Sequence, residues 1–155
     1  MLSHLKKYEI LLASNSHRRR ELLAEVDESY PDTLSGEEIP LYISQEKAAA
    51  YRRFMKDNTL LITADTIVWL DGKVYGKPRD IADAKAMLQA LSGKTHTVIT
   101  GVTLTSLQKQ ISFAVSTEVT FATLGDDEID YYVEKYRPLD KAGAYGVQEW
   151  IGYIG

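Results

Sequence analysis

The stretch YEILLASNSHRRRELL, residues 8–23, decides the fold of this chain. Its first six residues, 8–13, predict a buried strand. Ser16 is a good N-cap, and Leu22 and Leu23 continue the helix that it would begin. A strand that leads straight into a helix is the repeating unit of α/β proteins, so the chain is expected to start as one.

The helix in this stretch would begin with three arginines, residues 18–20. Cations at a helix N-terminus oppose the helix dipole, which favours anions there by a few tenths to about 1 kcal/mol each. The cost disappears when an anion binds, because backbone N–H groups, serine hydroxyls and guanidinium groups then converge on it. The stretch predicts a phosphate site, and the alternative is a solvated arginine run on a surface helix.

The order of the elements that follow also indicates an α/β fold. Most are marked by apolar periodicity and turn residues. They are a helix over 41–55, a strand over 60–64, an extended segment 67–70 that enters a hairpin turn at Asp71-Gly72, a helix from Asp80 to Gly93, paired antiparallel strands 97–107 and 110–124, a helix over 129–136 opened by acidic residues 126–128, and a tail 141–155 of loops around a final strand.

Composition excludes several classes of protein. The 155 residues suffice for one domain, and no apolar run approaches the roughly 20 residues of a membrane span. A net charge of −4 disfavours nucleic acid as a partner, although a small polyanion needs only a local basic pocket. The chain has no cysteine and no apolar leader near its N-terminus, which is typical of a cytoplasmic protein.

Three further segments are candidates for chemistry. Asp65 directly follows an apolar strand, where α/β sheets place metal ligands and general bases; the alternative is a capping aspartate of a turn. Lys77, between a glycine and a proline, is a positioned charge or a solvated turn lysine. The small residues of 140–148 permit close approach to a ligand or form a packed turn, and Gln148 offers a donor and an acceptor to a base edge.

In this order, the segments resemble the Maf family of septum-formation-like nucleoside triphosphate pyrophosphatases. The resemblance covers nearly the whole chain. It rests on the joint occurrence of 12–23, Val26-Asp27-Glu28, Glu46-Lys47-Ala48, Ala64-Asp65-Thr66-Ile67-Val68, Asp71-Gly72, Gly76-Lys77-Pro78, Met87-Leu88, Leu91-Ser92-Gly93-Lys94, His96, Thr100-Gly101-Val102 and 140–148.

The resemblance implies hydrolysis of a nucleoside triphosphate to the monophosphate and pyrophosphate, with Mg²⁺ or Mn²⁺ as the metal. It implies that Asp65 is the catalytic base and, with Glu28, a metal ligand. The residues that it assigns to the substrate are Ser14, Arg18, Arg19, Lys47, Thr66, Lys77, Lys141 and Gln148.

Three of these positions sort substrates within the family, and here they are Arg18, Thr66 and Gln148. This set resembles the branch that acts on dTTP and UTP. The branch that acts on 7-methyl-GTP has tryptophan, glutamine and glutamate there. Two alternatives to a dTTP/UTP pyrophosphatase stay open: a 7-methyl-GTP-type pyrophosphatase, and a nucleotide-binding regulator of septum formation and cell division with weak hydrolysis.

The family also implies an elongated two-lobed mixed β-sheet with flanking helices and a central cleft, as in inosine triphosphatases, and a homodimer. We expect one Maf-like domain over residues 1–155, with two lobes that share one sheet. His17 stands where the family usually has proline, which is favourable at a helix start but not required. Relative to the family, we expect a segment to be missing between residues 24 and 25, and the C-terminal tail to be missing after Gly155.

Overall fold

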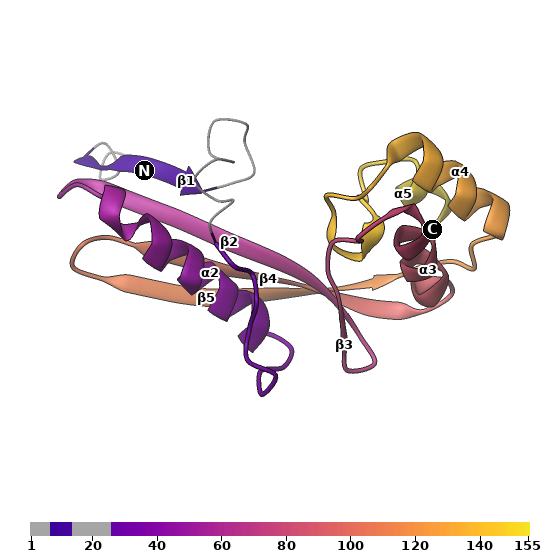
Figure 1. Cartoon of the computed structure of the whole chain (residues 1–155), viewed down its shortest axis with the longest axis horizontal. Coiled ribbons are helices and arrows are strands. Elements are labelled where there is room, and N and C mark those ends of the chain that lie inside the picture. Colours follow the sequence, from indigo (N-terminus) through magenta and orange to yellow (C-terminus); the bar gives the residue numbers. More distant parts are fainter. Residues whose placement is uncertain (1–6, 14–25) are drawn as a thin grey trace. The chain divides into compact units, whose positions relative to one another are not determined.

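The structure is a computed structural model that describes residues 7–13 and 26–155, and Figure 1 shows its elements. Strands and helices alternate along much of the chain. They are β1 (Glu9–Ala13), α2 (Glu38–Tyr51), a 3₁₀ turn (Arg52–Phe54), β2 (Thr59–Leu70), β3 (Lys73–Tyr75), α3 (Ile81–Leu91), β4 (Thr95–Thr105), β5 (Gln110–Thr120), α4 (Asp126–Tyr136), a second 3₁₀ turn (Ala142–Ala144) and α5 (Ile151–Ile154).

The strands form one mixed sheet with the order β1-β2-β4-β5, and β3 pairs with the far end of β2. β1 runs parallel to β2, in a register that sets Glu9 opposite Thr59 and Ala13 opposite Thr63. β3 runs antiparallel to β2 after a two-residue hairpin at Asp71 and Gly72. Both hairpin residues have positive φ, 52° and 77°, as a type I′ turn requires. The predicted α/β class, with a mixed sheet and flanking helices, is confirmed.

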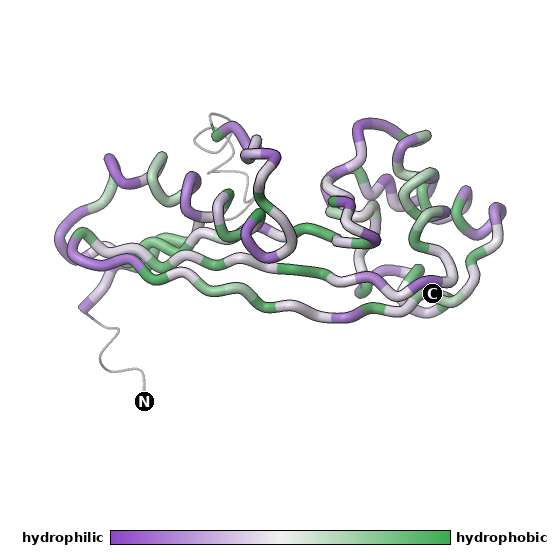
Figure 2. The backbone as a smooth tube through the Cα atoms, turned by 90° about the horizontal axis from the view of Figure 1, so that it is seen from below, coloured by the Kyte–Doolittle hydropathy of each residue, from purple (hydrophilic) through white to green (hydrophobic). Residues whose placement is uncertain are grey.

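The contacts divide the chain into two compact units, and the first comprises Met1–Asp65 and Thr100–Val115. Its core is small: Ala48 and Tyr51 of α2 pack against Leu61 of β2, with Leu11 at the edge. Alternate residues of a strand point to opposite faces of a sheet, so the neighbours of Leu11 point away from this core. On that other face the apolar side chains of Ile10, Leu12, Ile111, Phe113 and Val115 are exposed. Figure 2 colours the hydrophobic stretches of the strands green.

The second unit comprises Thr66–Ile99 and Ser116–Gly155 and holds the larger core. α3 and α4 pack on each other here, with Leu88 and Tyr132 fully buried. The side chain of Asp80 accepts a hydrogen bond of 2.8 Å from the backbone N–H of Asp83, so the predicted cap of α3 is confirmed. Gly93 has φ +67° just after α3, as a helix-ending glycine should.

Several predicted boundaries are wrong. α2 begins before Pro40, which the first helical turn tolerates, and it ends at Tyr51 because a 3₁₀ turn follows. The strand 60–64 and the extended segment 67–70 form one strand, β2, which runs through Asp65 without a break. The described tail 141–155 contains no strand; it holds the second 3₁₀ turn and α5 instead.

In the part of the chain that the structure describes, no helix is long and apolar enough to cross a membrane. The elongated shape, the central cleft and the missing segments stay predictions.

Candidate active site

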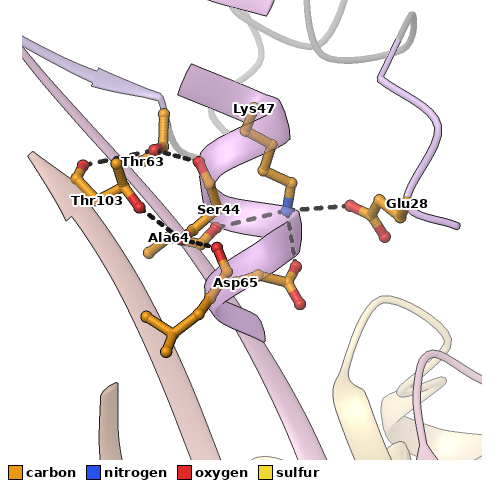
Figure 3. A network of polar contacts seen from close by, with 8 residues as sticks. Glu28, Ser44, Lys47, Thr63, Ala64, Asp65 and Thr103 are labelled. Carbon is orange, nitrogen blue, oxygen red and sulfur yellow. Dashed lines mark hydrogen bonds and ion pairs between the residues drawn. The ribbon is translucent and has the colours of Figure 1, made fainter. Parts of the chain in front are cut away.

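A lysine on the buried face of α2 meets two carboxylates in the first unit (Figure 3). Ser44, Lys47, Ala48 and Tyr51 are all buried at helical spacing on the side of α2 that lies on the sheet. Burial on that stripe directs the Lys47 side chain toward β2 and not toward solvent. There the Nζ of Lys47 lies 2.7 Å from the Oδ1 of Asp65 and 3.1 Å from the Oε1 of Glu28.

The pair of Lys47 and Asp65 is shielded from water, whereas Glu28 is not. The exposed fractions of the side chains are 10% for Lys47, 12% for Asp65 and 44% for Glu28. Burial acts to lower the pKa of Lys47, but the charges and hydrogen bonds of Asp65 and Glu28 outweigh it and raise that pKa. The same attraction favours an ionised carboxylate on Asp65, which is the form that a general base needs.

Asp65 does not lie where the sequence placed it. The prediction set it at the carboxyl end of a short strand, but β2 continues to Leu70. The alternation of buried residues along β2 changes phase after Ile67: Thr59, Leu61, Thr63 and Ile67 are buried at odd positions, and Val68 and Leu70 follow at even ones. Asp65 therefore lies inside a long strand, in the same row of side chains as Thr63 and Ile67.

The two carboxylates converge on a single cation, the ammonium group of Lys47. Among residues 7–13 and 26–155, no group of three or more His, Cys, Asp or Glu side chains is placed to hold a metal ion. Two carboxylates nevertheless suit Mg²⁺, which keeps several waters and is commonly held by one or two carboxylates together with substrate phosphates. Glu28 and Asp65 therefore fit a metal that phosphate oxygens help to bind.

In the second unit, Lys141 lies between two carboxylates. Its Nζ is 2.9 Å from the Oδ1 of Asp140 and 3.2 Å from the Oε1 of Glu149. The hydrogen bond to Asp140, followed by that to Glu149, raises the pKa of Lys141, and burial acts in the opposite direction. Lys141 is thus a charged ammonium at neutral pH, held in place and 24% exposed.

Tyr132 of α4 holds the turn that carries Glu149. Its hydroxyl donates to the Oε2 of Glu149 and accepts a bond of 3.1 Å from the backbone N–H of Gly146. Burial and the bond to Glu149 raise the pKa of Tyr132, so the hydroxyl stays protonated and available as a donor. Tyr132 and Glu149 were missed by the sequence analysis, because nothing in the sequence connects residues 132, 141 and 149.

Gly146 brings Lys141 and Gln148 together. A Cβ at Gly146 would lie 3.1 Å from the Cε of Lys141 and 3.3 Å from the Nε2 of Gln148. Both side chains therefore approach the α-carbon of this glycine, which leaves them the room. These contacts are with side chains of the protein itself, so the predicted approach of this segment to a ligand stays a prediction.

Gly143 fits the packed turn that the sequence analysis gave as the alternative. It has φ +68°, and a Cβ there would lie 2.8 Å from the Cγ2 of Val68. Its N–H donates to the backbone oxygen of Gly76 over 3.0 Å. At this position the glycine allows close packing inside the protein, and it joins the segment of Lys77 to that of Lys141.

The predicted site residues fall into three groups. Ser14, Arg18 and Arg19 lie outside the described residues. The first unit brings Glu28, Lys47 and Asp65 together, and the second brings Lys141 and Gln148 together. Thr66, next to Asp65, and Lys77 are exposed residues of the second unit.

Comparison with known proteins gives a consistent picture. The sequence model of the Maf-like protein family matches residues 9–155. A dTTP/UTP pyrophosphatase of Phocaeicola vulgatus is 60% identical over 167 positions, which span all of this chain and 86% of that protein. Proteins of the same name from Bacteroides thetaiotaomicron and Porphyromonas gingivalis are 59% and 52% identical, and the alignments span 100% and 99% of this chain and 86% and 84% of those proteins.

The alignment with the Phocaeicola protein is longer than this chain, 167 positions against 155 residues, so at least 12 positions carry residues that only the relative has. Among solved structures, the Staphylococcus aureus Ham1 protein aligns with a TM-score of 0.49 and 18% identity, over 94% of this chain and 90% of that one. The family model spans nearly the whole chain, and relatives above half identity span it too, so the chain belongs to the Maf family.

Proposed function

We propose that this chain hydrolyses dTTP and UTP to the nucleoside monophosphate and pyrophosphate. The observation that carries the proposal is the shielded pair of Asp65 and Lys47, 2.7 Å apart, which presents an ionised carboxylate inside β2. The relatives above half identity that carry the name dTTP/UTP pyrophosphatase support the substrates. So does the set Arg18, Thr66 and Gln148, which matches that branch of the family.

In the proposed reaction, Asp65 takes the proton from a water molecule while the water oxygen attacks the α-phosphorus of the substrate. The α–β anhydride bond breaks, and pyrophosphate leaves with the electron pair of that bond. Lys47 stabilises the carboxylate form of Asp65 before the attack. The bond that forms is between the water oxygen and phosphorus, and the proton ends on Asp65.

The substrate's negative charge requires cations beyond this pair. We assign Lys141 and Lys77 to the phosphates, together with Ser14, Arg18 and Arg19 of the N-terminal stretch. Glu28 and Asp65 would hold a divalent metal, Mg²⁺ or Mn²⁺, which when bound neutralises charge that develops on the phosphate oxygens. Lys141 suits its role because Asp140 and Glu149 fix its ammonium group in one place.

We assign Gln148 to recognition of the pyrimidine ring of the substrate. A side-chain amide offers both a donor and an acceptor, and the edge of a pyrimidine presents the complementary pair. The Nε2 of Gln148 lies beside Gly146 and Lys141, so the group that reads the base and a group that holds phosphate come from one turn. The homodimer and a cytoplasmic location also stay proposals.

The proposal is tested by product analysis with the full chain, Mg²⁺ and five triphosphates: dTTP, UTP, CTP, GTP and 7-methyl-GTP. Monophosphate and pyrophosphate from dTTP and UTP, with little turnover of the other three, is the expected result. Orthophosphate and a diphosphate would mean that the γ-phosphate is attacked, which contradicts the mechanism. Preference for 7-methyl-GTP would contradict the proposed recognition of a pyrimidine nucleotide.

A further inference from the structure

We propose that a buried network of hydroxyl groups sets the position of α2 on the sheet and so holds Lys47 on Asp65. The network consists of Thr63, Ser44, Thr103 and Ser112, one residue each from β2, α2, β4 and β5. In this reading Thr63 and Ser44 are positioning residues that act through Lys47. The inference rests on the proposed function only for its activity readout.

The network lies beside the Lys47–Asp65 pair in both elements (Figure 3). Ser44 precedes Lys47 by three residues in α2, and residues three apart share a helix face. Thr63 precedes Asp65 by two residues in β2, and residues two apart share a sheet face. The same faces of β2 and α2 therefore meet twice: Thr63 contacts Ser44, and Asp65 contacts Lys47 further along both elements.

Two hydrogen bonds join Thr63 and Thr103 to Ser44. The hydroxyl of Thr63 donates to the backbone oxygen of Ser44 over 2.7 Å. The Thr63 hydroxyl also lies 3.4 Å from the backbone oxygen of Thr103, a longer second acceptor. The hydroxyl oxygens of Ser44 and Thr103 lie 2.7 Å apart. α2 is thus bound to β2 through its backbone and to β4 through its side chain at the same residue.

The remaining bonds fix the donors among the hydroxyl groups of Ser44, Thr103 and Ser112. Ser44 donates to the backbone oxygen of Leu41 over 2.8 Å, so Thr103 must donate to Ser44. Ser112 then donates to Thr103 over 2.9 Å, and the amide of Gln45 donates to Ser112 over 3.1 Å. The chain of donors begins on α2 at Gln45, crosses β5 and β4, and returns to α2, so a shift of the helix would break several bonds together.

The complete burial of these hydroxyl groups supports a role in fixing the position of α2 on the sheet. Ser44, Thr63 and Thr103 are completely buried at 0% exposure. Apolar residues of similar size would fill the same space without the need to satisfy hydroxyls, and hydrophobic contacts tolerate sliding more than hydrogen bonds do. Lys47 needs a fixed helix because its long side chain has many rotamers, and a misplacement of about 1 Å can cost roughly a hundredfold in rate.

The test substitutes Thr63→Val, which removes the hydroxyl and keeps the shape. Thr63→Ser, which keeps the hydroxyl, is the rescue. Thr105→Val is the matched control, because Thr105 is equally buried at 0% but hydrogen-bonds to Gln110 and not to α2. We expect kcat with dTTP to fall roughly tenfold or more in Thr63→Val, with KM little changed, and to stay within about twofold in Thr63→Ser and Thr105→Val.

Two further measurements separate positioning from a general loss of stability. In a Lys47→Met background, Thr63→Val should cause no further fall in kcat, because the residue through which it acts is gone. Crystal structures of the variants should show the Lys47 Nζ to Asp65 Oδ1 separation beyond hydrogen-bond distance in Thr63→Val and unchanged in Thr105→Val. This distance is read even if the chain hydrolyses no nucleotide, so the inference and the proposed function can fail separately.

An intact Lys47–Asp65 contact in Thr63→Val would overturn the inference. So would equal losses of kcat in Thr63→Val and Thr105→Val, or a loss that Thr63→Ser does not restore.

Discussion

The substitution Lys47→Met tests how much the shielded ion pair contributes to the fold. At 2.7 Å and an effective dielectric constant of about 20, the attraction between Lys47 and Asp65 is about 6 kcal/mol, and desolvation of the two groups offsets most of it. Removal of Lys47 leaves the carboxylate of Asp65, 12% exposed, without its cation. The expected loss in the free energy of unfolding is about 3–5 kcal/mol. Glu28, 44% exposed, adds little, because solvent already screens it.

The assay is urea unfolding of the full chain at neutral pH, with Lys85→Met as the control. Lys85 is also 2.7 Å from a carboxylate, that of Asp130, but this carboxylate is 56% exposed and screened by solvent, so the control should lose far less stability than Lys47→Met. The raised pKa of Lys47 adds a pH test: its stabilisation is complete below pH 10.5 and is lost as the pH rises through the raised pKa. Equal stability of the two variants, or an alkaline step that survives in Lys47→Met, would refute the reasoning.

Three further predictions follow from the second unit and from the start of α2. Tyr132→Phe removes the hydroxyl that bonds to Glu149 and to the backbone of Gly146. It should lower the free energy of unfolding by about 1–3 kcal/mol and raise KM for dTTP. An unchanged KM in steady-state kinetics would contradict the role of this turn. Burial lowers the pKa of His96 from 6.5, so the stability that neutral His96 contributes is complete above pH 6.5 and is lost as the pH falls through the lowered pKa. Denaturation curves at pH 7.5 and about 5.5 should show a loss in the free energy of unfolding that is smaller in His96→Asn than in the wild type. Equal losses in the two proteins would contradict this role of His96. In Gly101→Ala the new Cβ would lie 2.4 Å from the backbone of Pro40, so the thermal midpoint should drop by several degrees or the chain should fail to fold, and a wild-type midpoint would show that α2 starts elsewhere.

Much of the fold follows from local signals in the sequence. Asp71-Gly72 predicted a hairpin and forms one, because both positions need positive φ and these residues tolerate it. Asp80 and Gly93 predicted the ends of a helix, and the structure places Asp80 as the cap and Gly93 just past the last turn. Signals of this kind act within a few residues, so the surrounding fold does not change them.

Other features depend on contacts that no local signal carries. The sequence ended one strand at Ala64 because Asp65 disfavours strand structure, but the pairing of β2 along its length carries the strand past it. The tail was assigned a strand from its aromatic and glycine content, yet its backbone forms a 3₁₀ turn and α5 on the core of the second unit. In both cases tertiary packing overrides the local preference.

The candidate site was predictable in its residues and not in its contacts. The resemblance to the family named Glu28, Lys47 and Asp65, and the structure joins all three. A lysine in phase with Ile43 on the apolar stripe of a predicted helix was itself a signal for a buried cation. The hydroxyl network gave no such signal, since its members lie on four elements and buried serines and threonines look ordinary in a sequence.

The most direct test of the account is the turnover of dTTP by Asp65→Asn beside Asp71→Asn. Asp71 is an exposed aspartate of the hairpin with φ 52°, a conformation that asparagine also adopts readily in such turns, so this control should keep wild-type kcat. If Asp65 is the base, Asp65→Asn should lose kcat by about a hundred- to ten-thousandfold and still bind dTTP in calorimetry. A kcat within a fewfold of wild type in Asp65→Asn would contradict the central claim.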